Sequence, residues 1–266
     1  EPSGGRVTEV RAAFLGMAGV TSAGTAAAFR DLAVQAGLDP ARVEVDHDIR
    51  IALAGGLGGR PGIALIVGTG SSCYGRTAEG RHWQTGGWGS LVADEGSGYD
   101  LARRAMVEAV RMADGRVQPS GLQDAVFRWL GVEGVSGILA RLYEQGLERD
   151  EIAAFAPQVV QLATDGDPVA RSLLRAGAAD LAEMVAANHA RLPTSERPEV
   201  VVTGGLGTAP TMYRDLIREA VFRLLPEARW CEPEMEPVAG AALLALGLGG
   251  IPPGPDVVQR LREDPR

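Results

Sequence analysis

Apolar segments and small-residue breaks alternate along the first part of the chain. The apolar run within residues 9–20 predicts a buried strand that leads into a turn, and residues 21–35 predict a helix. A short strand follows at 43–45, and an apolar helix begins at 49–53 and stops in a glycine-rich segment. This order of strand, helix, strand and helix favours a mostly parallel sheet with both faces covered.

The next segment changes to short strands joined by tight turns. Residues 62–67 form an apolar strand, residues 68–71 a Gly-Thr-Gly-Ser turn, and a strand then returns toward a second turn at 77–80. A third strand spans 81–85. Two tight turns that join three strands predict an antiparallel meander.

Helical periodicity dominates the chain from residue 101 to about 192, with a capping sequence at 165–168. Residues 198–203 return to a strand, and glycines then lead into another helix. Residues 238–248, rich in alanine and leucine, predict the last strong helix. Beyond Gly249 the proline and charge content predicts a loosely held tail.

Composition narrows the function classes. The chain has 266 residues, of which 45% are apolar and 23% charged, as in a globular protein without membrane-spanning segments. A net charge of -8 disfavours broad contact with nucleic acid or anionic lipid. All 26 basic residues are arginines, which excludes Walker-type loops, protein kinases and Schiff-base enzymes because each needs a lysine. The two cysteines form neither a disulfide framework nor a metal-ligand spacing, so we expect a cytoplasmic protein.

Two glycine-rich turns and one aspartate are the first candidates for chemistry. The turn at 68–71 offers backbone N–H groups to an anion, although it also fits a plain hairpin. Residues 200–207 run from a strand through glycines into a helix N-terminus, which suits a nucleotide but is common in α/β folds. Asp48, between a strand and a helix, either caps the helix or accepts a hydroxyl proton.

The segment 86–99 is the most unusual part of the sequence. Trp88 lies between glycines, and the acidic pair Asp94 and Glu95 precedes Gly-Ser-Gly. Capping by Asp94 and core packing of Trp88 would explain parts of the segment. The glycine density instead suits a sugar ring, with its apolar face on the indole and its hydroxyls on a carboxylate.

Together these motifs resemble the N-acetylglucosamine kinase group of the BadF/BadG/BcrA/BcrD-type ATPase family, within the actin, sugar kinase and Hsp70 superfamily. The resemblance covers nearly the whole chain, and its strength lies in the joint order of the motifs. The matching segments are residues 15–20, Asp48 with Ala52 and Leu53, and residues 68–71, 86–89, 94–97, 203–205 and 236–241.

The resemblance implies an α/β chain with the two-lobed ribonuclease H-like (actin-like ATPase) fold, in which the N-terminal lobe is incomplete. Residues 1–58 would belong to the N-terminal lobe and 59–236 to the C-terminal lobe, and 237–266 would form a helix and tail that pack back on the N-terminal lobe. ATP and Mg²⁺ would bind in the cleft, and the γ-phosphoryl group would pass to the 6-hydroxyl of an amino sugar, foremost N-acetylglucosamine. The implied partners are this sugar and ATP, without nucleic acid or membrane. Whether the protein forms a homodimer is left open.

The resemblance also assigns roles to residues. Asp48 would be the general base, and no protein ligand to the metal is assigned. The nucleotide-binding residues would be Gly68, Thr69, Gly70, Gly177, Gly204 and Gly205. The sugar-binding residues would be Ser71, Ser72, Gly87, Trp88, Gly89 and Asp94.

Two departures from the family pattern bear on these expectations. The family normally opens with a phosphate-gripping Asp-Gly-Gly-Gly-Thr-type hairpin and a sugar-contacting asparagine, well upstream of the segment that matches Leu15. Neither is in this sequence, so we expect a truncated chain that alone lacks efficient catalysis. Ser72 stands where many members have asparagine, which leaves glucosamine and N-acetylmuramic acid open as substrates.

Two alternatives come from other functional classes. One is an ATPase that activates a radical dehydratase through a bridging iron–sulfur cluster, for which Cys73 and Cys231 are poor candidates. The other is a non-catalytic sugar sensor, which would need a partner because no basic helix-turn-helix segment is visible.

Overall fold

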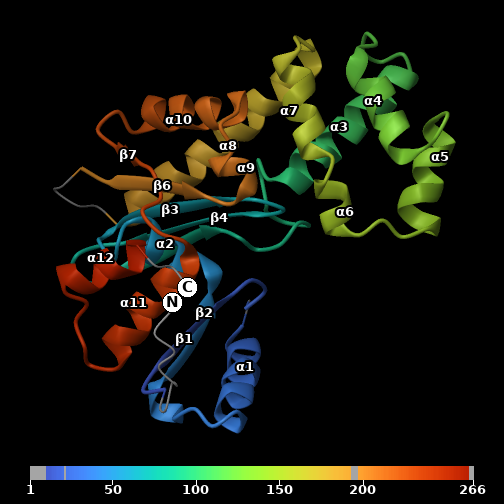
Figure 1. Ribbon diagram of the computed structural model, residues 1–266. Coiled ribbons are helices and arrows are strands. Elements are labelled where there is room, and N and C mark those ends of the chain that lie inside the picture. The colour runs from blue at the N-terminus through green and yellow to red at the C-terminus, as the bar shows by residue number, and fades with distance from the viewer. Residues whose placement is uncertain (1–9, 21, 193–196, 264–266) are drawn as a thin grey trace.

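The computed structural model describes residues 10–20, 22–192 and 197–263. The strands of this part form two sheets (Figure 1). β1 and β2 pair in parallel, and a five-stranded sheet has the order β5-β4-β3-β6-β7. β3, β4 and β5 form the predicted antiparallel meander, whereas β6 and β7 run parallel to β3. The strands are β1 (Ala13–Met17), β2 (Val43–His47), β3 (Gly62–Val67), β4 (Ser71–Arg76), β5 (His82–Gly86), β6 (Glu199–Thr203) and β7 (Arg229–Cys231).

Helices connect and cover these sheets, and several begin where the sequence carries a cap. Asp167, for example, accepts hydrogen bonds from the N–H groups of Val169 and Ala170 at the start of the longest helix, α8. The α-helices are α1 (Ala23–Gln35), α2 (Asp48–Gly56), α3 (Gly98–Ala113), α4 (Gly121–Leu130), α5 (Val135–Leu139), α6 (Arg149–Ala153), α7 (Ala156–Thr164), α8 (Pro168–Arg191), α9 (Gly205–Thr208), α10 (Met212–Leu224), α11 (Pro237–Leu248) and α12 (Pro255–Glu263). A 3₁₀ turn spans Pro40–Arg42, and a π-helical turn spans Ala140–Glu144.

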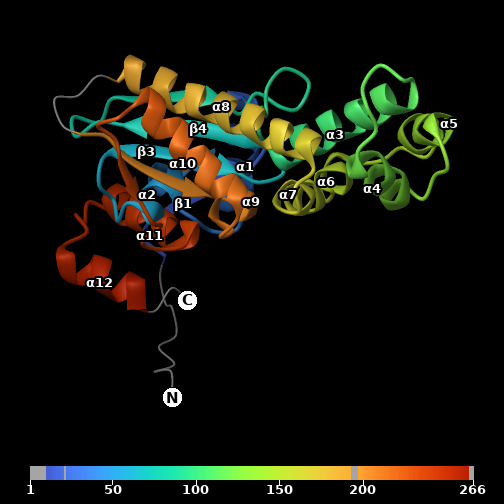
Figure 2. The ribbon, with the colours of Figure 1, turned by 90° about the horizontal axis from the view of Figure 1, so that it is seen from above.

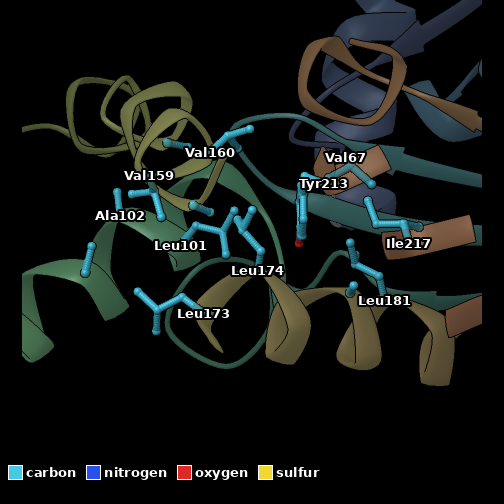
Figure 3. Packing of buried hydrophobic residues seen from close by; sticks show 14 of the residues in the cluster. Val67, Leu101, Ala102, Val159, Val160, Leu173, Leu174, Leu181, Tyr213 and Ile217 are labelled. Carbon is cyan, nitrogen blue, oxygen red and sulfur yellow. The ribbon is translucent and has the colours of Figure 1, made fainter. Parts of the chain in front are cut away.

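The five-stranded sheet is covered on both faces. Alternate residues of its central strands point to opposite sides, so one strand supplies side chains to two cores. Leu65 and Val67 of β3 belong to the large core beneath α8 and α10, whereas Ala64 packs with Ile49 and Leu53 of α2. Figures 1 and 2 show α8 and α10 on one side of the sheet and α2 on the other. Figure 3 shows the large core, in which α3, α7, α8 and α10 meet.

Helices α3 to α7 lie between β5 and β6 in the sequence. In both ribbon views α4 and α5 lie farthest from the sheets. α6 and α7 instead return to the sheet, where they help to line a cavity at its edge. The inserted helices therefore place residues far along the chain beside the meander turn.

α11 packs against α2 and β1, and its contact with α2 brings the two backbones together. A Cβ added to Gly240 would lie 2.1 Å from the Ile51 carbonyl oxygen and 2.4 Å from the Gly55 nitrogen. Only small residues permit this approach, so the glycines fix how the two helices cross.

The segment beyond Gly249 differs from the predicted loose tail. It forms α12, whose Val258 and Leu261 pack against Met235 and Leu243, and whose Arg262 pairs with Glu234. The apolar pair is three residues apart and lies on one helix face, which the surrounding prolines and charges obscured in the sequence. Among the described residues, no helix combines the length and the apolar composition needed to cross a membrane.

Candidate active site

A cavity of about 660 Å³ opens at the carboxyl ends of β3 and β6. Of the predicted nucleotide residues, Gly68, Thr69 and Gly205 line it. Its other walls come from α6, α7 and the start of α10. The volume lies in the range of small-molecule sites, and ligands of open α/β sheets bind at the carboxyl ends of strands.

The turn between β3 and β4 is held from behind by the start of α3. The Gly98 N–H donates to the Gly68 carbonyl over 2.8 Å, and the Tyr99 N–H donates to the Thr69 carbonyl over 3.1 Å. Within the turn, the Gly68 N–H donates to the Gly70 carbonyl over 2.9 Å. These bonds engage the turn carbonyls on the helix side and leave the exposed Thr69 side chain at the cavity.

Gly204 lets the end of β6 lie directly against β3. Its φ is +85°, and a Cβ there would lie 2.6 Å from the Val67 carbonyl oxygen. Both the left-handed conformation and the lack of space require glycine. Gly205 then begins α9 at the cavity wall.

Thr211, which the sequence reasoning missed, adds a polar group to the same cavity. It is the N-cap residue of α10, yet its side chain makes no capping hydrogen bond. Within the described part of the chain, its buried Oγ1 has no hydrogen-bond partner, and Thr211 lines the cavity. A buried hydroxyl without a partner is costly, so a ligand that bonds to it gains affinity. In the sequence, Thr211 follows the glycines at 204–207 by a few residues, in the region where a helix is predicted.

Asp48 is the first residue of α2 rather than its N-cap. α2 packs against β3, and the end of the helix lies at the start of that strand: a Cβ on Gly62 would lie 2.4 Å from Leu57 Cδ1. This direction would place Asp48 toward the carboxyl end of β3, the end at which the 68–70 turn begins.

Burial sets the proton affinity of the Asp48 carboxyl. It raises the pKa of this group, although backbone N–H groups, including that of Ile49, and the charge of His47 oppose the shift. A carboxylate with a raised pKa is a stronger base at neutral pH. The position and the pKa direction of Asp48 both suit proton acceptance.

Direct contacts link four of the predicted sugar residues in two pairs, Ser71 with Asp94 and Ser72 with Gly87. The Ser71 N–H donates to Asp94 Oδ1 over 3.1 Å, and the Ser71 hydroxyl donates to the Glu95 carbonyl over 2.8 Å. A Cβ on Gly87 would lie 2.6 Å from Ser72 Oγ. Among the described residues, that Ser72 hydroxyl is buried without a partner. The segment after β5 is thus folded onto the start of β4.

Trp88 is not a core residue and Asp94 does not cap α3, so neither takes the purely structural role that the sequence left open. The Trp88 side chain is 59% exposed, so it is not a core residue. Ser97, not Asp94, is the N-cap of α3. Asp94 is buried and has a φ of +70°, unusual for a residue other than glycine, and Gly89 is an exposed left-handed glycine beside the indole.

Three predicted nucleotide residues do not line the cavity: Gly70 and Gly204 lie beside it in the two glycine-rich turns, whereas Gly177 lies on another element. Gly177 lies within α8, and a Cβ there would lie 2.6 Å from the Tyr213 hydroxyl and 3.1 Å from Gly96 Cα. Among the described residues that line the cavity, Gly177 does not occur. The lack of a side chain at Gly177 allows α8 to approach the loop before α3 closely.

The two cysteines lie in different environments. Cys73 is fully buried in the large core, and burial raises its pKa, which disfavours the thiolate. Cys231 on β7 packs against the cluster on the α2 side of the sheet. An iron–sulfur cluster needs accessible thiolates, so this arrangement does not support the dehydratase-activator alternative.

Three relatives resemble this chain. An N-acetylmuramic acid/N-acetylglucosamine kinase of Clostridium acetobutylicum is 32% identical over 205 residues, which cover 77% of this chain and 67% of the relative. An N-acetyl-D-glucosamine kinase of Dictyostelium discoideum is 26% identical and is covered to 65%. The structure of a candidate N-acetylglucosamine kinase of Chromobacterium violaceum has a TM-score of 0.71 at 31% identity, with 88% of this chain and 75% of that chain covered. This likeness confirms the predicted α/β actin-like ATPase fold.

The chain spans about two thirds of the length of these two curated relatives. The model of the BadF/BadG/BcrA/BcrD ATPase family matches residues 3–245, most of the chain. This match spans both sheets and every segment of the site described above. The chain therefore belongs to the BadF/BadG/BcrA/BcrD ATPase family.

Proposed function

We propose that the protein phosphorylates the 6-hydroxyl of an amino sugar with ATP, and that N-acetylglucosamine is the preferred acceptor. The observation that carries this proposal is the hydrogen bond from the Ser71 N–H to the buried Asp94 carboxylate. This bond connects the 68–71 turn, which we assign to the nucleotide phosphates, with Asp94, which we assign to the sugar. The names of the relatives support the same activity.

The nucleotide would occupy the 660 Å³ cavity. Its adenosine would lie by Gly205 and Thr211, where the partnerless hydroxyl supplies a hydrogen bond. Its phosphates would extend to the 68–70 turn and the Thr69 side chain. We assign Gly204 to the nucleotide site because it lets the end of β6 approach β3. We do not assign Gly177 to this site, because it does not line the cavity among the described residues.

A magnesium ion would enter the site together with the nucleotide. The described residues contain no group of three or more acidic, histidine or cysteine side chains that could hold a metal. Mg²⁺ is commonly bound through one or two carboxylates, water and substrate phosphates, so the ion would be held mainly by the phosphates of ATP. When bound, the ion supplies charge neutralisation to the phosphates.

The sugar would lie between the exposed indole of Trp88 and the Asp94 carboxylate, with the Ser72 hydroxyl as a further donor or acceptor. Gly87 and Gly89 would let the backbone approach the ring. Asp48 would accept the proton of the 6-hydroxyl while that oxygen forms a bond to the γ-phosphorus. The bond from phosphorus to the bridging oxygen breaks, and ADP leaves with its electron pair.

Two further assignments belong to the same proposal. Residues 1–58 and 237–266 would form one lobe and 59–236 the other, with the sugar between them; the contacts of α11 with α2 and β1 support this division. The protein would act in the cytoplasm, where ATP is available and free cysteines such as Cys73 stay reduced.

A coupled ADP-release assay on the complete gene product tests the proposal. N-acetylglucosamine, glucosamine, N-acetylmuramic acid and glucose are compared as acceptors, and we expect the highest kcat/KM with N-acetylglucosamine. Trp88→Ala should raise the sugar KM about tenfold, since a lost aromatic contact costs about 1 kcal/mol or more. Trp83→Ala is the matched control, because Trp83 is also exposed but stacks on Arg191.

Three outcomes would contradict the proposal. These are the absence of sugar-dependent ADP release, sugar binding by calorimetry without turnover, and equal effects of the two tryptophan variants. Binding without turnover would favour a sensor.

A further inference from the structure

Arg149, which no motif singled out, lies against the turn that we assign to phosphate. Its Nη2 donates to Asp94 Oδ2 over 2.6 Å, while the other oxygen of the same carboxylate accepts from the Ser71 N–H. The Asp94 side chain is 4% exposed and the Arg149 side chain 46%. Arg149 thus pairs with a buried acid while its own side chain stays partly exposed.

Gly70 makes room for this ion pair. A Cβ at Gly70 would lie 2.3 Å from Arg149 Nη2 and 2.7 Å from Asp94 Oδ1. Any larger residue would displace the pair or the turn. The guanidinium, the carboxylate and the turn backbone are therefore packed as one unit.

The position of Arg149 on α6 links this unit to the cavity. Arg149 is the first residue of α6, and the next residue, Asp150, lines the cavity together with Ala153. A capping box between Glu148 and Glu151 fixes the start of the helix. The helix that forms one wall of the cavity therefore also supplies the cation for Asp94.

The backbone at Asp94 needs such a restraint. Its φ of +70° lies in the left-handed region, which costs a non-glycine residue about 1 kcal/mol or more. Such a conformation persists where the surroundings hold it, and the Ser71 and Arg149 bonds are the side-chain contacts that do so.

We propose that Arg149 is a positioning residue, which holds the Asp94 carboxylate in place and aimed at the sugar acceptor. The inference rests on the proposed sugar kinase activity. Each Asp94 oxygen has a second lone pair, so the carboxylate can accept a sugar hydroxyl while both existing bonds remain. Arg149 acts through Asp94 and makes sugar binding depend on α6.

The test compares Arg149→Met and Arg149→Lys in the complete gene product. Arg149→Met should raise the sugar KM about tenfold, as expected when a charge-assisted hydrogen bond is lost, while the Kd for ADP by calorimetry changes less than about twofold. Arg149→Lys should recover part of the sugar affinity, because it restores the charge without the planar fork. Arg103→Met is the matched control: Arg103 is 49% exposed and pairs with Asp100, which is 7% exposed. Its sugar KM should stay at the wild-type value.

The outcomes separate this inference from the proposed function. If the wild type neither binds nor phosphorylates any amino sugar, both fall. If the wild type is active and Arg149→Met matches the Arg103→Met control in sugar KM, the Arg149 inference alone is wrong. A lower melting temperature with unchanged sugar KM, or a weaker ADP affinity with unchanged sugar KM, also overturns it. Arg149→Lys decides the matter if Arg149→Met does not fold.

Discussion

Among single residues, Asp48 carries the proton transfer in the proposed reaction, and its surroundings adjust it for that task. Burial raises the pKa of its carboxyl, so the group holds a proton to higher pH than an ordinary aspartate. A general base works only when ionised. Activity should therefore fall with decreasing pH through this raised pKa, at a higher pH than an unperturbed aspartate would give.

Asp48→Asn removes the base without removing its volume. We expect kcat to fall about 10²- to 10⁴-fold and ATP affinity to stay unchanged. A raised pKa in the folded state means that the ionised form opposes folding above that pKa, so the neutral amide should not lower the melting temperature at pH 7. Profiles of kcat/KM against pH for both proteins check this. An Asp48→Asn variant with wild-type turnover and the same acid limb would remove Asp48 from the mechanism.

Sequence reasoning reached some site residues and missed others for a clear reason. Thr69 and Gly205 lie in glycine-rich turns that directly follow apolar strands. Such a pattern involves only neighbouring residues, so it can be recognised in a single sequence. Arg149 is 55 residues from Asp94 in the chain, and only the folded helices bring the two together. Gly177 was assigned to the nucleotide, yet its smallness serves helix packing, which one sequence does not distinguish from ligand approach.

At the scale of elements, the crossing of α8 over the loop before α3 positions the acid-bearing segment. Tyr213 of α10 is fully buried and donates its hydroxyl to the Gly96 carbonyl over 2.6 Å. Gly177 leaves space for this hydroxyl. The three elements therefore hold the segment that leads from Asp94 into α3.

Gly177→Ala and Gly247→Ala test this packing because both glycines are helical. The first methyl would lie 2.6 Å from the Tyr213 hydroxyl, so we expect a loss of about 1–3 kcal/mol in the free energy of unfolding. The second meets no atom within 4 Å and should gain about 0.5–1 kcal/mol from helix propensity. Urea denaturation measures both. Equal changes in the two variants would contradict the close approach.

Element prediction succeeded where periodicity was strong and failed where it was short. The meander of β3, β4 and β5 follows from apolar segments bounded by glycine turns. α12 was missed because only Val258 and Leu261 mark its buried face, and prolines precede it. Its attachment depends on Met235 and Leu243, contacts that local sequence does not encode.

Over the whole molecule, the net charge is -8 and the sequence contains no lysine. Arginine is therefore the basic side chain that can pair with acids such as Asp94. The fold places the turn, the acid-bearing segment and the cavity at one end of the five-stranded sheet. We propose that Asp48, the first residue of α2, faces that end. The central claim is that these parts form a single site for phosphate and sugar.

A crystal structure of the complete gene product with N-acetylglucosamine and a non-hydrolysable ATP analogue tests this claim most directly. We expect the sugar O6 within about 2.6–3.2 Å of an Asp48 carboxylate oxygen, and the terminal phosphate at the 68–70 turn. A sugar bound away from both Asp48 and Asp94, or a nucleotide whose phosphates point away from Thr69, would contradict it.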